Sequence, residues 1–217
     1  MLTQTTRPRL GSRRSGFSLI EMLAVMVILS ILLVFLAFRL GGMGESAKAR
    51  MTETYLNEVG LAASEFEHET GDYPSSSWKS EWGAQPNKQN LGIEALCLTL
   101  WSESYGGTAL SEDKLDNTDG DRSKKSLTTH ANRDLFELVD SWGNPIAYFH
   151  RRDYGREDVY LTIEEETAEW VESTVKAHTS PKTGSYYNPR GFQLISAGQD
   201  GIFDTEDDLT NFQRGDD

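Results

Sequence analysis

The chain has 217 residues, 37% of them hydrophobic and 25% charged, which predicts one globular domain or one domain with an appendage. Its 34 acidic and 21 basic side chains give a formal net charge of -13, so the surface should repel phosphate backbones, which argues against nucleic-acid binding. The single cysteine, Cys97, excludes an intramolecular disulfide and a multi-cysteine zinc site.

Charge is sorted along the amino-terminal end of the chain. Residues 1–16 contain four arginines and no acidic residue, and the apolar run 17–38 that follows has one formal charge, on Glu21. This run reaches the roughly 20 residues that span a bilayer core. Because a basic flank stays in the cytoplasm, we expect residues 17–40 to cross a membrane once, with the amino terminus cytoplasmic and the acidic remainder outside.

Two other interpretations of this end compete with a processed leader. A cleaved secretory signal has an apolar core of about 7 to 15 residues followed closely by a small-residue site. The run here is longer, and its A-x-A candidate at residues 47–49 lies well beyond it. An uncleaved signal anchor in front of a periplasmic domain is the stronger of the two.

Glu21 bears on the choice between these interpretations. An unpaired carboxylate in hydrocarbon costs roughly 2.5 kcal/mol or more, so it normally has a partner. No Lys or Arg lies between residues 17 and 38, so the partner must come from another chain or from a new amino terminus. Cleavage after Gly16 would create such an amine on Phe17, four residues before the acid. The pattern therefore predicts a device for self-assembly.

The residues Gly16-Phe17-Ser18-Leu19-Ile20-Glu21-Met22-Leu23 closely resemble the class III leader of type IV pilins and of the pseudopilins of type II secretion systems. The resemblance implies that a prepilin peptidase cuts after Gly16 and N-methylates Phe17. It also implies that Glu21 pairs with the amine of a neighbouring subunit. The 16-residue leader is longer than those common among pseudopilins.

An amphipathic helix is expected beyond the apolar run, over residues 41–71. Its apolar positions recur at spacings of three and four, which predicts one buried stripe. These positions are Ala47, Met51, Tyr55, Val59, Ala62 and Phe66. Gly71 suits the position after the last helical residue, and Pro74 cannot continue the helix. Three glycines at positions 41–44 predict either a break between an anchor and a soluble domain or a functional hinge.

Residues 72–217 are expected to form the globular head. The composition predicts an irregular loop at 75–90, a short apolar helix at 91–101 that buries Leu96, Cys97 and Leu100, and an exposed insertion at 103–132. Candidate strands are 146–149, 159–163 and 192–196, with a further insertion at 164–190. Together these elements predict an α+β fold in which a long amino-terminal helix packs on a small antiparallel sheet.

Two segments of the head extend the resemblance. The run D-x-W-G-N-P-x-x-Y at 140–148 is similar to a segment of major pseudopilins, the GspG type. The acidic end at 196–209 resembles the calcium loop that closes the same proteins. By composition alone this loop is either a metal site or a solvated acidic loop, and its spacing is not that of an EF-hand. The resemblance implies calcium, with Ser196, Asp204 and Asp207 as leading ligands and Asp200 and Asp208 as further ones.

No catalytic constellation emerges. The four histidines are scattered, and the H-E-x-x-H, G-x-S-x-G and P-loop patterns are missing from the sequence, so we expect no enzyme activity. The resemblance implies a major pseudopilin in the bacterial inner membrane with a periplasmic head, polymerised with copies of itself to drive protein export. Implied partners are prepilin peptidase, minor pseudopilins, the inner-membrane secretion platform and membrane lipid. A type IV pilus or competence pilin is the alternative within the family, and a signal-anchored periplasmic calcium-binding domain is the alternative outside it.

Overall fold

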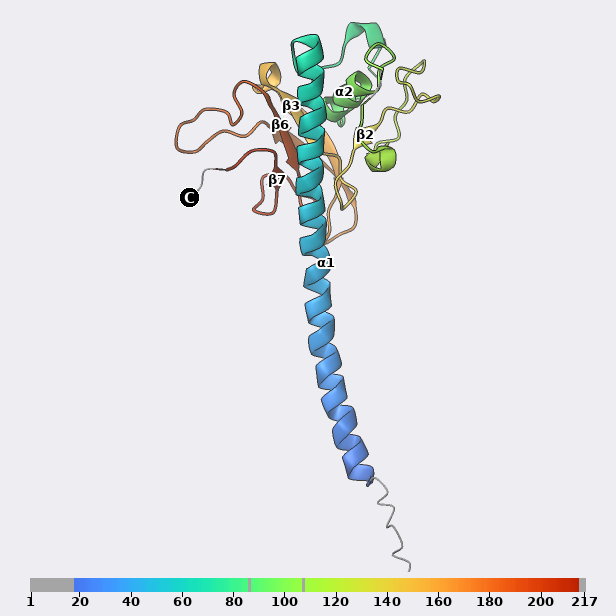
Figure 1. The fold of residues 1–217 in the computed structure, drawn as a ribbon, viewed down its shortest axis with the longest axis vertical. Helices are drawn as coiled ribbons and strands as arrows, with labels where there is room; N and C mark the ends of the chain where they lie inside the picture. The colour runs from blue at the N-terminus through green and yellow to red at the C-terminus, as the bar shows by residue number, and fades with distance from the viewer. Residues whose placement is uncertain (1–17, 86, 107, 215–217) are drawn as a thin grey trace, which may run out of the picture. The chain divides into compact units, whose positions relative to one another are not determined.

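The computed structural model describes residues 18–85, 87–106 and 108–214, without the side chains of residues 35–43 (Figure 1). The chain divides into two compact units, Met1–Gly44 and Glu45–Asp217. Helix α1 (Leu19–Thr70) contributes to both. It is continuous through positions 41–44, so the glycines do not break the helix, although the boundary between the units falls at Gly44. A hinge at these glycines stays a prediction.

In the first unit, the segment of α1 from Leu19 to Val34 presents apolar side chains on every side, apart from Glu21 and Ser30. The side chains from Leu19 to Val34 are all exposed, and the one hydroxyl among them, on Ser30, donates to the carbonyl oxygen of Met26 at 2.8 Å. This bond satisfies the hydroxyl within the helix. Among the residues that the structure describes, no helix combines the length and the apolar character needed to cross a membrane.

In the second unit, α1 buries one stripe against the head. The buried side chains are Thr52, Tyr55, Leu56, Val59, Ala62 and Ala63. The expectation is confirmed from Tyr55 to Ala62 but wrong at Ala47 and Met51, which are exposed. Thr52 lies in the stripe in their place because its hydroxyl oxygen accepts the Ser141 backbone N–H at 3.1 Å. The helix ends as predicted, with Gly71 at φ 89 and its N–H on the carbonyl of Glu67.

Short elements build the rest of the head. The helical ones are η1 (Ser80–Trp82), α2 (Leu91–Leu100), η2 (Glu112–Lys114) and η3 (Arg151–Asp153). The strands are β1 (Leu115–Asp116), β2 (Glu137–Leu138), β3 (Ala147–His150), β4 (Glu157–Ile163), β5 (Trp170–Lys176), β6 (Phe192–Ser196) and β7 (Leu209–Thr210). They form three antiparallel sheets, in the orders β3-β6-β7, β1-β2 and β4-β5.

The expectation of one sheet from three predicted strands is therefore wrong in its pairing. Strand β4 pairs with β5, which lies inside residues 164–190, and β7 completes the central sheet. Most of β5 is exposed, so its sequence lacks the alternation of buried and exposed residues that marks a strand. The exposed insertion expected at 103–132 is also corrected: β1 pairs with β2, Ser123 and Thr128 are buried, and Asp119 accepts a hydrogen bond from Asn87.

Helix α2 is buried along nearly its whole length and packs against β3. Its predicted core residues Leu96, Cys97 and Leu100 are all buried, as expected. Gly92 allows the close approach, since a Cβ there would lie 2.2 Å from the carbonyl oxygen of Tyr148. The helix therefore has no room for a side chain at its second residue.

We expect Gly92→Ala to lower the free energy of unfolding of the full chain in detergent by about 3 kcal/mol, because the new methyl group overlaps backbone that cannot move without disturbing β3. The melting temperature should fall by roughly 6 to 12 °C. Gly155→Ala is the matched control, because a Cβ at Gly155 meets nothing within 4 Å. Equal melting temperatures for the two variants would show that α2 is not held against β3 as closely as described.

Candidate functional site

The start of α1 is capped by two side chains that bond each other's backbone. The Ser18 N–H donates to Glu21 Oε2 at 2.8 Å, and the Glu21 N–H donates to Ser18 Oγ at 3.3 Å. Ser at the cap and Glu three residues later form a capping box, which satisfies two otherwise unpaired N–H groups. The S-x-x-E spacing could have predicted this cap from sequence. It gives Glu21 a local role in addition to the predicted pairing between subunits.

The predicted processing site lies outside the described residues, because it consists of Gly16 and Phe17. Cleavage and methylation there stay predictions. Within the described part of the chain, Glu21 forms no ion pair with a Lys, Arg or His side chain. A cationic partner for this carboxylate would therefore have to come from outside that part, as expected.

The D-x-W-G-N-P turn is held by the buried carboxylate of Asp140. Asp140 Oδ1 accepts the backbone N–H groups of Trp142 (2.9 Å) and Asn144 (3.0 Å), and Oδ2 accepts the Ser196 hydroxyl (2.7 Å). Gly143 completes the turn at φ 90. Burial raises the pKa of Asp140, against the lowering effect of these hydrogen bonds. The carboxylate thereby joins the turn before β3 to the end of β6.

The same turn reaches two further elements. Asn144 Oδ1 accepts the Ile163 N–H at the end of β4 at 2.7 Å, and Trp142 Nε1 donates to Glu45 Oε2 on α1 at 2.7 Å. The motif that carries the resemblance thus has a structural role. It links α1, β4 and the central sheet within the second unit.

The acidic loop between β6 and β7 is folded around Asp207. Asp207 Oδ2 accepts the N–H groups of Gln199 (2.7 Å) and Asp200 (3.0 Å), and Oδ1 accepts the Thr205 hydroxyl (2.6 Å). Burial opposes ionisation of Asp207, but these hydrogen bonds outweigh it and hold its pKa below the usual value. Gly198, at φ 67, is required because a Cβ there would lie 2.4 Å from the Asp207 carbonyl oxygen.

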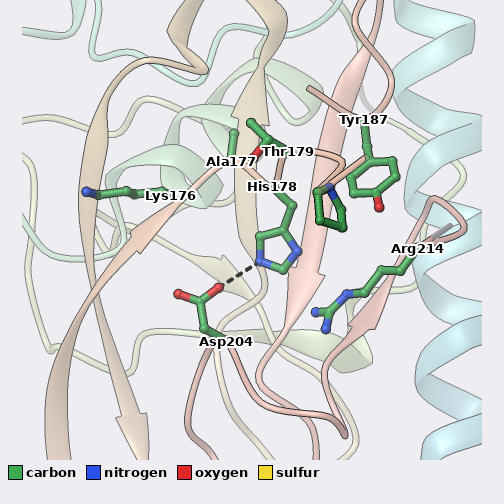
Figure 2. A pocket seen from close by; sticks show the side chains of 8 residues that line it. Lys176, Ala177, His178, Thr179, Tyr187, Asp204 and Arg214 are labelled. Carbon is green, nitrogen blue, oxygen red and sulfur yellow. Dashed lines mark ion pairs between the residues drawn. The ribbon is translucent and has the colours of Figure 1, made fainter. Parts of the chain in front are cut away.

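Two of the predicted calcium ligands meet at the side of this loop. Ligand atoms of Asp204, Asp208 and His178 lie within 4.8 Å of one another. Asp204 Oδ1 lies 3.1 Å from His178 Nε2, and both line an open pocket of about 410 Å³ beside Arg214 (Figure 2). Asp208 Oδ2 accepts from Arg214 Nη2 at 2.7 Å, while its buried Oδ1 has no hydrogen-bond partner within the described part of the chain. Burial raises the pKa of Asp208 to about 6.

The other three predicted ligands have different neighbours. Ser196 donates to Asp140, Asp200 adjoins Asp207 through its backbone, and Asp207 holds the loop together. The structure therefore brings Asp204 and Asp208 together but does not bring all five into one cluster. The sequence analysis does not predict a role for His178 or Arg214. His178 follows β5 and Arg214 follows β7, and no local motif marks either residue.

The family comparison bears on the amino terminus. A family model described as the prokaryotic N-terminal methylation motif matches residues 11–37. The chain carries a prepilin-type leader. The match spans Gly16, Phe17 and Glu21 and supports a type IV pilin-like protein, and the α+β fold with a long first helix and small antiparallel sheets is compatible with that class. No curated protein and no solved structure matches the chain.

Proposed function

We propose that this chain is a structural pseudopilin of a type II secretion system, similar to its major subunit. Prepilin peptidase would remove residues 1–16, and the mature subunit would polymerise into a short periplasmic fibre that drives protein export. The observation that carries the proposal is the methylation motif at 11–37, which overlaps the start of α1. The helix side chains from Leu19 to Val34 are all exposed, and all but Glu21 and Ser30 are apolar.

An apolar surface on all sides of a helix supports burial of that helix in an apolar environment. Exposed patches of this kind on a soluble monomer mark contacts with a membrane or with other proteins. We infer that lipid covers residues 17–40 before assembly and that neighbouring copies cover them in the fibre. The amino terminus would be cytoplasmic and the head periplasmic, because the leader that precedes the apolar run carries four arginines and no acidic residue.

The subunit's contribution would be packing and motion, without catalysis. Glu21 would pair with the amine of Phe17 on a neighbouring subunit, which sets the register between copies. Minor pseudopilins and the inner-membrane secretion platform would be the other contacts. The D-x-W-G-N-P turn and the acidic end favour secretion over the alternative, a type IV pilus or competence pilin.

Deletion of the gene in its native host tests this choice. The proposal predicts that folded exported proteins accumulate in the periplasm and that the intact gene restores their export. Loss of surface pili or of DNA uptake, with export unchanged, would instead assign the chain to the pilus branch. Restoration by a gene encoding an uncleavable leader would contradict both and favour a signal-anchored periplasmic domain.

Calcium at the carboxyl-terminal loop is part of the proposal. Asp204 and Asp208 would hold the ion, and support comes from Asp208 Oδ1, a buried oxygen that lacks a hydrogen-bond partner. The fit is partial, because Arg214 already places a cation on Asp208 Oδ2 and His178 adds nitrogen to a donor set that calcium prefers to be oxygen. A bound ion would stabilise the end of the chain.

A further inference from the structure

A second group of acidic side chains lies inside the head, apart from the carboxyl-terminal loop. We call Glu94, Asp119, Asp121 and Glu137 the inner carboxylate cluster. Glu94 belongs to α2, Glu137 to β2, and the two aspartates to the turn after β1. Carboxylate oxygens of Glu94, Asp119 and Glu137 lie within 4.8 Å of one another.

The cluster contains buried oxygen atoms without partners. Glu94 is 1% exposed, and its Oε1 accepts no hydrogen bond from any residue that the structure describes. Both carboxylate oxygens of Asp121 and the side-chain oxygen of Asn117 are buried and unpartnered in the same way. A buried polar atom without a partner is costly, and native proteins rarely leave several together. A cation bound among these carboxylates would supply a partner for the oxygen lone pairs that face it.

The charges in the cluster point to the same conclusion. Burial, and then the negative charges of Asp121, Glu137 and Asp119, raise the pKa of Glu94 well above its usual value. Burial raises the pKa of Glu137 to about 8 and that of Asp121 to about 7. In the part of the chain that the structure describes, none of these four carboxyl groups forms an ion pair with a basic side chain. Ionised together, these groups would form an uncompensated buried charge of one sign, which is strongly destabilising unless a cation or bound protons neutralise it.

Hydrogen bonds from outside the cluster hold its oxygens in place. Asn90, in the left-handed conformation at φ 52, donates from Nδ2 to Glu137 Oε1 at 3.0 Å, and the Thr118 N–H donates to Glu137 Oε2 at 3.0 Å. Asn87 Nδ2 donates to Asp119 Oδ2 at 2.8 Å. Each of these carboxylate oxygens keeps a further lone pair, so each can still bind an ion.

We propose that the inner carboxylate cluster binds a calcium ion through Glu94, Asp119 and Glu137, whose ligand atoms lie within 4.8 Å of one another, with Asp121 adding negative charge beside them. Calcium takes six to eight oxygen ligands at about 2.3 to 2.6 Å, so two ligands of one ion can be about 5 Å apart, as the observed spread requires. The all-oxygen donor set disfavours zinc and copper, and magnesium demands a stricter octahedron.

The ion would join three segments that are distant in sequence. It would tie α2 to β2 and to the turn at 117–121, and so order the region first expected to be an exposed insertion. This inference does not depend on the proposed function, because it concerns the folding of the head alone.

Bound calcium per chain tests the proposal, measured on the full chain in detergent by equilibrium dialysis after treatment with EDTA. Glu94→Gln and Glu137→Gln should each bind about one ion fewer than the unchanged chain. Asp116→Asn is the matched control, because Asp116 is exposed at the end of β1 and lies outside the cluster, so this variant should lose none. Equal binding by Glu94→Gln and Asp116→Asn would overturn the proposal.

A second measurement separates loss of calcium binding from poor folding. It also excludes calcium bound at the carboxyl-terminal loop. In chains that also carry Asp208→Asn, calcium at 100 times its Kd should raise the melting temperature by roughly 5 to 10 °C. The added change Glu94→Gln should abolish this shift, and Asp116→Asn should preserve it. Absence of any calcium-dependent shift in the Asp208→Asn chain would instead mean that the cluster is neutralised by bound protons, and the proposal would be rejected.

Discussion

Asp140→Ala should lower the free energy of unfolding of the head by about 3 to 5 kcal/mol, the largest loss that we expect from a single polar side chain here. The change leaves two backbone N–H groups and the Ser196 hydroxyl without their acceptor inside the protein. Each unsatisfied buried group costs about 1 to 3 kcal/mol. The turn also positions Asn144 against β4, so the loss should spread to that strand.

Urea unfolding of the full chain in detergent measures this effect, with two variants for comparison. Asp140→Asn should be less harmful than Asp140→Ala, because the amide oxygen can still accept from the backbone. Asp113→Ala, at an exposed acid in η2, should change the free energy of unfolding by less than about 0.5 kcal/mol. If Asp140→Ala were no worse than Asp113→Ala, the turn would not be the structural link described here.

Glu21→Ala should be processed normally but should form at least about tenfold less fibre. The substitution leaves the Phe17 amine of the neighbouring subunit unpaired in an apolar environment, which costs more than the roughly 1.4 kcal/mol that changes an equilibrium tenfold. The same substitution also removes half of the capping box at the start of α1. Fibre yield, measured by sedimentation of the mature chain, must therefore be read against variants that separate charge from capping.

Two substitutions make this separation. Glu21→Gln keeps a side chain that can complete a capping box but removes the charge, so it should assemble as poorly as Glu21→Ala. Ser18→Ala removes the other half of the cap and keeps the charge, so it should assemble well. Normal fibre from Glu21→Gln would show that capping, and not pairing with a neighbouring amine, explains the glutamate.

Parts of the fold with a strong local pattern could be predicted from the sequence. The apolar run and the three-and-four spacing that follows predict α1, and the glycine after Thr70 predicts its end. The sequence also predicts the bounds of α2 and β6 to within a residue, because both are buried along their length and bounded by polar or glycine-containing segments.

Elements that depend on distant partners could not be predicted. Strand β5 is mostly exposed and is held by its pairing with β4, and the two-residue β7 is held by β6. Glu94 stands in an apolar run, where the sequence predicts a core helix and gives no reason for an acid. Its explanation lies in Asp119, Asp121 and Glu137, which the fold brings beside it from later in the chain. Likewise, His178 reaches Asp204 of the acidic loop only through tertiary packing.

The central claim, that this chain is a processed pilin-like subunit, is tested most directly by the intact mass and amino-terminal sequence of the membrane-bound protein, expressed with and without a prepilin peptidase. The account predicts a chain that begins at N-methylated Phe17 only when the peptidase is present, and a Gly16 variant that stays uncut. An uncut chain in both cases, or a cut near Ala49, would contradict it.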